Sequence, residues 1–317
     1  MLKSLIKYSL IPVLAAATFA QAAQLSTDAR SAIPHDVQQM VVIDYQAMEN
    51  SSSAMALRDK VMPPELKQFE QTLTKSGLND NHDVDVLAFV LFRPSPGSSA
   101  LDTVGIAQGQ FEVQDILASF RKQKVKPRVL RTNTIWPLGR SGMVLCFVDP
   151  STMIFGGSEA VKKSLDARDG ETQSMLTNNS MMSAMQGVDS QDLWSILDAD
   201  GTQTMMRQVL GEAGGLTDFD SIRKRLQASW YSMNFQHGVH FNLTIATGDT
   251  FAAATMSSLL TAAIILRKTT STEAEKQALS DTSVSSNSGQ LAINFAASDG
   301  EFASLLESPL FQSMIHN

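Results

Sequence analysis

The sequence of 317 residues contains a single cysteine, Cys146. An intramolecular disulfide is therefore impossible, and zinc or iron–sulfur sites that need several thiolates are nearly excluded. Basic residues are also few: 25 Lys and Arg stand against 32 Asp and Glu, a formal net charge of -7. Because nucleic-acid binding depends on neutralising phosphates, we expect no nucleic-acid partner.

A glycine-rich phosphate loop and a dinucleotide-binding fingerprint are both missing from the sequence. We therefore predict no cofactor. Charged residues make up only 18% of the chain and hydrophobic residues 43%. This balance excludes a disordered chain and provides enough apolar material for a folded core.

One apolar stretch lies at the beginning of the chain. Lys3 and Lys7 precede an apolar stretch at residues 10–20, and Ala20-Gln21-Ala22 fits the small-x-small rule for signal-peptide cleavage. The run is much shorter than the ~20 residues that a spanning helix needs. We therefore predict a signal peptide at residues 1–22 and a periplasmic or secreted mature chain. Residues 251–266 are short and carry four Ser and Thr, so a buried helix is expected there and no membrane span in the mature chain.

Hydrophobic periodicity predicts an alternation of strands and helices along the body of the chain. Strands are expected near residues 41–47, 86–92, 104–111, 128–136, 143–148, 152–155, 193–197, 231–236, 239–245 and 291–295. Helices are expected near residues 63–77, 113–120, 158–165, 205–210, 250–266 and 273–279. The Ser/Thr-rich stretch at residues 269–288 is expected to be mobile.

Both halves of this pattern follow the order strand, helix, two strands, helix, strand. That is the βαββαβ order of ferredoxin-like, split βαβ sheets. We therefore predict an α+β fold of two tandem split βαβ units, at residues 23–187 and 188–317. Each unit would form a mainly antiparallel sheet with helices on one face. The uncovered faces would pack against each other, with a ligand groove between the units.

Two serines lie in sequences that resemble nucleophile motifs. Ser158 follows Gly156-Gly157 between a strand and a helix, as in a hydrolase elbow, but Ala160 replaces the final glycine. The favoured interpretation is that Ser158 caps the helix, because an elbow serine belongs to a parallel sheet and the sheet expected here is mainly antiparallel. Ser221 and Lys224 match Ser-x-x-Lys, but the partner motifs are missing, and a solvated basic helix face is the favoured interpretation. A serine hydrolase using Ser158 or Ser221 remains an alternative function.

Metal ligation has two candidate groups, each with an ordinary structural explanation. His237 and His240 bracket a predicted hairpin turn but lie on opposite faces and have no third ligand. Met181, Met182 and Met185 could hold Cu(I), since thioethers are soft ligands, or could fill a helix core. A periplasmic metal-binding protein is therefore a second alternative. We expect Cys146 to be an inert core thiol.

An acidic turn at Asp198-Ala199-Asp200-Gly201 resembles part of a calcium loop. Aligning Gly201 with the invariant glycine of an EF-hand places Ile196 at the first ligand position and Arg207 at the closing one. Neither residue can ligate calcium, so we expect a tight turn here.

One segment resembles a pattern in uncharacterised exported bacterial proteins. In Val148-Asp149-Pro150-Ser151-Thr152-Met153-Ile154-Phe155-Gly156-Gly157-Ser158-Glu159-Ala160-Val161 an apolar strand ends in Asp, and a Thr-led strand, glycine and a helix follow. Asp192-Leu193-Trp194 is similar to the start of the second half of those proteins. The resemblance extends mainly over residues 140–200. It implies an exported α+β protein and supplies no catalytic residue.

These features favour an exported, non-enzymatic binding or scaffolding protein. No acid, base and nucleophile converge in the sequence, whereas the predicted core is well patterned. The partner, whether a protein or a small ligand, and the oligomeric state are not specified by any motif.

Overall fold

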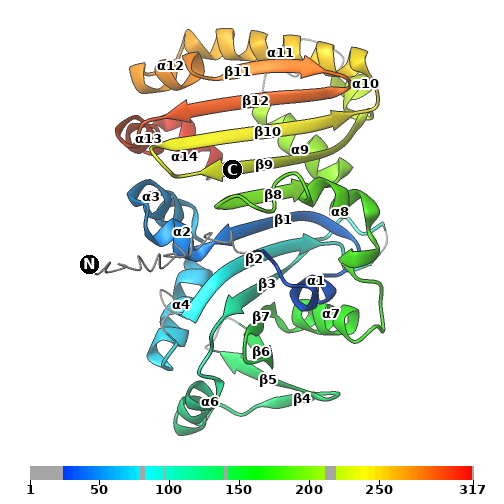
Figure 1. The fold of residues 1–317 in the computed structure, drawn as a ribbon, viewed down its shortest axis with the longest axis vertical. Coiled ribbons are helices and arrows are strands. Elements are labelled where there is room, and N and C mark those ends of the chain that lie inside the picture. The colour runs from blue at the N-terminus through cyan, green and yellow to red at the C-terminus, as the bar shows by residue number, and fades with distance from the viewer. Residues whose placement is uncertain (1–23, 79–82, 96, 139–141, 211–218, 316–317) are drawn as a thin grey trace, which may run out of the picture.

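Twelve strands form one sheet in the computed structural model, which describes residues 24–78, 83–95, 97–138, 142–210 and 219–315 (Figure 1). The signal peptide predicted at residues 1–22 lies outside these residues. The strands are β1 (Val37–Asp44), β2 (Val84–Phe92), β3 (Asp102–Gly109), β4 (Arg128–Leu130), β5 (Asn133–Leu138), β6 (Met143–Asp149), β7 (Thr152–Gly157), β8 (Leu193–Leu197), β9 (Leu226–Asn234), β10 (Val239–Thr247), β11 (Ser283–Asn287) and β12 (Gln290–Ala297).

Helices connect and cover these strands, and several begin where the sequence provides a cap. Pro64 is the first residue of α4, where a fixed φ and a missing N–H cost nothing. Thr272 and Ser298 form capping boxes with Glu275 and Glu301. The helices are α1 (Thr27–Ser31), α2 (Tyr45–Glu49), α3 (Ser52–Val61), α4 (Pro64–Lys75), α6 (Val113–Lys122), α7 (Ser158–Arg168), η1 (Met175–Thr177), α8 (Asn179–Met185), α9 (Ala199–Leu210), α10 (Phe219–Arg223), α11 (Thr250–Lys268), α12 (Glu273–Ser280), α13 (Asp299–Leu306) and α14 (Pro309–Ile315).

The strand order places the two halves of the chain side by side in one sheet. It runs β11-β12-β10-β9-β8-β1-β2-β3-β7-β6-β5-β4, and neighbouring strands are antiparallel. The halves meet at the pair β1–β8, which we call the seam; there Gln39 is opposite Leu197 and Ile43 is opposite Leu193. The predicted α+β class with an antiparallel sheet is confirmed.

The predicted ferredoxin-like arrangement is not found. In a split βαβ unit the two strands joined by the helix run parallel with another strand between them, whereas β2 is the direct antiparallel neighbour of β1, with Asp44 opposite Val86. The helices between them therefore leave and re-enter the sheet at the same end. The expected packing of two sheet faces is also wrong, because the halves share strand hydrogen bonds at the seam.

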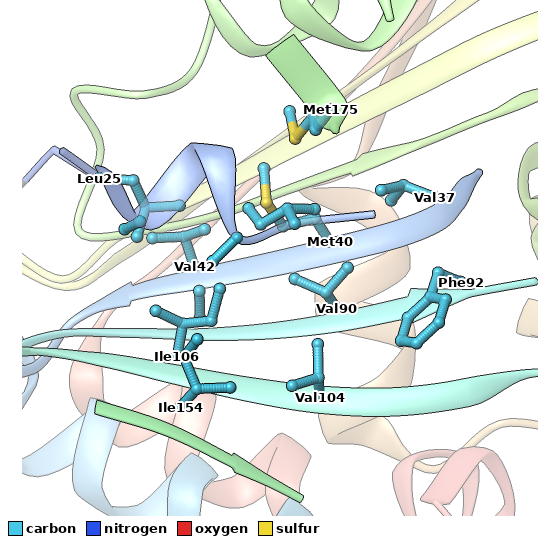
Figure 2. Close-up of a cluster of buried hydrophobic side chains, with 14 of the residues drawn as sticks. Leu25, Val37, Met40, Val42, Val90, Phe92, Val104, Ile106, Ile154 and Met175 are labelled. Carbon is cyan, nitrogen blue, oxygen red and sulfur yellow. The ribbon is translucent and has the colours of Figure 1, made fainter. Parts of the chain in front are cut away.

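The central hydrophobic cluster lies on one face of the sheet, beneath α1, α7 and α8. Figure 2 shows apolar side chains of β1, β2, β3 and β7 converging there, with Met40, Val90, Ile106 and Ile154 in the middle. Trp194 of β8 extends the cluster across the seam and is 1% exposed. The two halves are therefore joined by a shared hydrophobic core in addition to the pairing of β1 with β8.

The opposite face carries separate clusters in each half. Phe69 of α4 and Ile116 and Phe120 of α6 pack on the β2–β7 side, and Phe155 stacks on Phe69 with ring centroids 4.7 Å apart. Beyond the seam, α9, α10 and α11 cover the strands of the second half in one cluster, and α3 and α13 pack together in another cluster with Leu193 and Val239. Every helix layer thus buries one apolar stripe.

Three local predictions require correction. The single strand expected at residues 128–136 is two strands, because Arg131 adopts a left-handed φ of 53° and turns the chain between β4 and β5. Ser158 does not cap α7; Gly157 is the N-cap residue and Ser158 follows it without a side-chain cap bond. The expected tight turn at residues 198–201 is the start of α9. The helix expected near residues 273–279 is α12, and β11, for which no strand was expected, follows it.

The helix expected to be buried at residues 251–266 is α11, which is buried on one side only. Met256, Leu259 and Leu260 pack into the cluster beneath it, whereas Phe251 is 71% exposed. Among the described helices, α11 is long and apolar enough to cross a membrane, and 28% of its apolar 18-residue stretch is buried. A one-sided core helix meets the same criteria, so length and composition do not place α11 in a membrane.

Candidate functional site

A cleft opens at one end of the seam, where strands from both halves begin or end. Val37 of β1 is opposite Phe92 of β2, and Leu197 of β8 is opposite both Gln39 and Ser229. The chain segments that enter and leave these strands enclose a cavity of about 300 Å³. Its walls are formed by Asp36, Val37, Arg93, Asn178, Ser180, Met181, Asp198, Ala199, Asp200, Gln227 and Ala228.

Arg93 crosses the seam at the base of this cleft. It directly follows β2, and its backbone N–H donates to the carbonyl of Asp36 at 2.9 Å. Its guanidinium donates to Asp198 at 2.8 Å, to Asp200 at 2.8 Å and to the side-chain oxygen of Gln38 at 3.1 Å. Burial lowers the pKa of Arg93, but the two carboxylates outweigh it and leave the pKa raised. The side chain therefore stays charged and holds the two halves together.

Asp198 is positioned by the end of β8 and the start of α9. Its Oδ1 accepts from the N–H of Gly201 at 2.8 Å, while Oδ2 accepts from Arg93. The carboxylate thus caps α9 and pairs with the guanidinium at the same time. Burial raises the pKa of Asp198, and the bonds from Gly201 and Arg93 oppose that rise without cancelling it.

The other wall of the cleft comes from the segment before β1 and from the start of α8. His35 Nδ1 lies 3.0 Å from the carboxylate of Asp36, and both side chains are partly exposed. Asn178 donates to the carbonyl of His35 at 3.0 Å and caps α8 through the N–H of Met181. The amide of Asn178 therefore connects the start of α8 to the segment that precedes β1.

The charge inside the cleft is unbalanced. Three carboxylates, from Asp36, Asp198 and Asp200, face a single guanidinium that already bonds two of them. Across the described residues, no group of three or more His, Cys, Asp or Glu side chains is arranged to hold a metal ion. The carboxylate in excess of the guanidinium can accept hydrogen bonds from a cationic donor.

The serine candidates do not converge with this cleft. Ser158 is exposed at the start of α7, and its hydroxyl has no hydrogen bond within the described part of the chain. Ser221 lies in the five-residue helix α10, and its side chain is outside the described residues. Lys224 follows that helix and is exposed. Within the described part of the chain Ser158 has no base as a hydrogen-bond partner, and the hydrolase role of Ser221 stays a prediction.

The metal candidates are separated or buried. His237 lies in the β9–β10 turn with a left-handed φ of 60°, whereas His240 lies on β10. Met181 and Met185 are buried in the central cluster, and Met182 packs against it. These methionines therefore fill the core beneath α8, and Met181 also forms part of the cleft wall.

Cys146 lies on β6 and is completely buried. Burial raises the pKa of its thiol to about 11. The expectation of an inert core thiol agrees with this environment.

The residues that define the cleft were not singled out by the sequence motifs. Arg93 and Asp198 are each the first charged residue after a buried strand, and this position is the signal that could have identified them. Their meeting depends on β1, which lies between β2 and β8 in the sheet, and no local pattern specifies that neighbour relation.

Comparisons with known proteins show a likeness of fold alone. No protein-family model matches the sequence, and no curated protein matches it. A solved structure of a protein called TP0453, in crystal form I, is similar with a TM-score of 0.51 and 10% identity, covering 90% of this chain and 98% of that one. Crystal form III of the same protein gives a TM-score of 0.50 and 10% identity, over 87% and 96% of the two chains.

Proposed function

We propose that the protein is an exported, non-enzymatic binding protein whose ligand site is the cleft at the seam. The observation that carries this proposal is the cleft itself. Its walls come from both halves, and several polar groups line its cavity of about 300 Å³. That volume is at the small end of ligand pockets. It suits a small molecule or a single side chain of a protein partner.

The ligand group that fits the cleft best is an organic cation, an amine or a guanidinium. Asp200 is 68% exposed on its side chain and Asp36 is 40% exposed, so both can reach an incoming group. Asn178, Ser180 and Gln227 supply neutral hydrogen-bonding groups around them. Met181 provides an apolar surface for the carbon chain of such a ligand.

Calorimetric titration with small amines tests the cleft. Putrescine, lysine amide and arginine amide are the probes, and butanol is the uncharged control. We expect binding of the cations only, and an approximately fivefold loss with Asp200→Asn, which corresponds to ~1 kcal/mol for an exposed charge contact. Asp115→Asn removes an exposed carboxylate from α6, far from the cleft in the strand order, and should change nothing.

Two results would contradict this function. If Asp200→Asn and the parent chain bind the amines equally well, the cleft is not the binding site. Absence of binding by every amine at ~10 mM, a concentration that detects even very weak contacts, would remove the cationic ligand.

The pH dependence of amine binding provides an independent check. Because the folded pKa of Asp198 is raised above its ordinary value of 3.8, its negative charge disappears at a higher pH than that of a free carboxylate. Amine affinity should therefore fall as pH is lowered through the raised pKa of Asp198. Asp198→Asn should flatten that part of the profile.

We also propose that the two halves, residues 23–187 and 188–317, are related as tandem copies of one unit. The order of β1, β2, β3 and β7 outward from the seam matches that of β8, β9, β10 and β12. A helical segment follows the first strand in both halves, and another follows the hairpin. This correspondence supports duplication, and a common cleft at the seam would follow from it.

Export remains part of the proposal through the signal-peptide features of residues 1–22. Expression of the whole chain in a bacterium, followed by fractionation and N-terminal sequencing, tests it directly. Cleavage after Ala22 and recovery in the periplasm or medium are expected, whereas an intact N-terminus in the cytoplasm would contradict it.

A further inference from the structure

The outer side of α11 is an uncovered helix face, independent of the cleft. Phe251, Ile265 and Leu266 are 71%, 63% and 52% exposed, which are high values for large apolar side chains. The remaining outward positions carry small or hydroxyl-bearing residues, Ala254, Thr255, Ser258, Thr261 and Ala262. No charged residue occurs between Thr250 and Leu266.

The hydroxyl groups on this face are already satisfied within the helix. Thr255 donates to the carbonyl of Phe251 at 2.9 Å, Ser258 donates to that of Ala254 at 3.1 Å, and Thr261 donates to that of Ser257 at 2.8 Å. Covering the face would therefore leave no hydroxyl without a partner. The whole face can lose water at a low cost in free energy.

The residues of the face are arranged symmetrically about Ser258. Phe251 lies seven positions before it and Ile265 seven after, Ala254 four before and Ala262 four after, and Thr255 three before and Thr261 three after. Phe251 thus corresponds to bulky Ile265, and the small residues correspond to one another, while Leu266 adds apolar surface beside Ile265. A two-fold interface requires this kind of self-complementarity, because residue i contacts residue j and j contacts i.

We propose that α11 packs antiparallel against α11 of a second copy of this chain, with the two-fold axis at Ser258. Phe251 of each copy then contacts Ile265 and Leu266 of the other. The small residues in the middle allow the helix axes to approach closely. The charges at the helix ends fit the same direction, since the antiparallel pair places the acidic cap Asp249 near Arg267 and Lys268 of the other copy.

A lipid surface is a less suitable occupant of this face. The bulky residues stand only at the two ends, while the middle is occupied by Ala, Ser and Thr. Interfacial helices carry large apolar residues along the buried face and basic residues beside it. The chain is instead acidic overall, at -7.

Sedimentation velocity of the mature chain over ~1–200 μM tests the pairing, since a single helix pair forms a small interface of micromolar strength or weaker. We expect a monomer–dimer equilibrium. Ser258→Glu puts two like charges on the axis and should weaken dimerisation at least tenfold. Ser304→Glu is the matched control: Ser304 is also exposed on a helix and donates to the carbonyl four residues earlier, at 2.9 Å.

Cysteine crosslinking tests the direction of the pair, and the buried native Cys146 does not interfere. Ser258→Cys should form a disulfide dimer by itself. Ala254→Cys and Ala262→Cys should crosslink when mixed, and much less when each is alone. Crosslinking of Ala254→Cys with itself would overturn the antiparallel arrangement.

The proposal fails if the chain remains monomeric over the whole concentration range. It also fails if Ser258→Glu and Ser304→Glu dimerise equally. A monomer that floats with phosphatidylcholine vesicles, and loses that property in Ser258→Glu, would assign the face to lipid instead.

Discussion

Removing the guanidinium of Arg93 should destabilise the seam in a pH-dependent manner. Arg93 is 15% exposed and Asp198 is 24% exposed on their side chains, so solvent screens the pair only in part. Arg93→Met would retain most of the carbon stem and leave the carboxylate of Asp198 with the Gly201 N–H as its described partner. The free-energy loss should be ~2 kcal/mol at neutral pH, between values for exposed and fully buried pairs.

The sign of the pH effect follows from the pKa of Asp198. Burial has already raised that pKa above the ordinary 3.8, and loss of Arg93 raises it further. Folded Arg93→Met then binds a proton at a pH where the unfolded chain does not, so the variant gains stability as pH falls. The difference between the parent chain and Arg93→Met should therefore be greatest near pH 7 and shrink toward pH 4.

Urea unfolding followed by tryptophan fluorescence measures this difference, since Trp194 is buried on β8 close to the seam. Asp198→Asn in the Arg93→Met background is the control. An amide oxygen can still cap α9, so the double variant should recover more than half of the loss. A loss that is the same at pH 4 and pH 7, or that is not recovered in the double variant, would refute the role assigned to the pair.

Two further experiments test the core. A Cβ at Gly105 would lie 2.2 Å from Cζ of Phe155, so Gly105→Ala should lower the free energy of unfolding by ~1–3 kcal/mol through overpacking. Phe155→Leu in the same chain should relieve part of that loss. If the two losses measured by urea unfolding are simply additive, the clash is contradicted. The pKa of about 11 at Cys146, against an ordinary 9.0, should make alkylation in the folded chain at pH 9 at least ~50-fold slower than in urea, and equal rates would show an accessible thiol.

Local periodicity was sufficient to locate most elements. Residues 193–197 were expected as a strand and form β8, while the stripe at residues 113–120 forms α6. The alternation on both sides of Gly238 forms the β9–β10 hairpin. These elements are determined by side chains a few positions apart, which is the range that periodicity reports.

Failures occurred where a remote contact decides the outcome. The strand expected at residues 128–136 is interrupted at Arg131, where a non-glycine residue adopts a left-handed φ and β4 turns back to pair with β5. The order of strands in the sheet depends on the pairing of β1 with β8, which are about 150 residues apart in the chain. The cleft depends on that pairing, so its residues were not predicted together.

The acidic segment at residues 198–201 shows how this limit affected the candidate site. Comparison with a calcium loop tested whether its own residues could bind an ion, and Ile196 and Arg207 excluded that. The structure gives Asp198 a helix to cap and a guanidinium from the other half to pair with. Its role is set by Arg93, which lies 105 residues earlier in the sequence.

The two halves differ in how their sheet faces are covered, and this difference explains why the uncovered faces do not pack against each other as expected. In the first half the sheet is covered on both faces, by α1 and α7 on one side and by α4 and α6 on the other. In the second half α11 covers one face of β10 and β12, and the other face of these strands bears His240, Asn242 and Asn294, which are exposed. Antiparallel strands with one solvated face alternate in this way. The second half therefore needs no sheet partner, and the apolar surface it leaves uncovered is the outer side of α11.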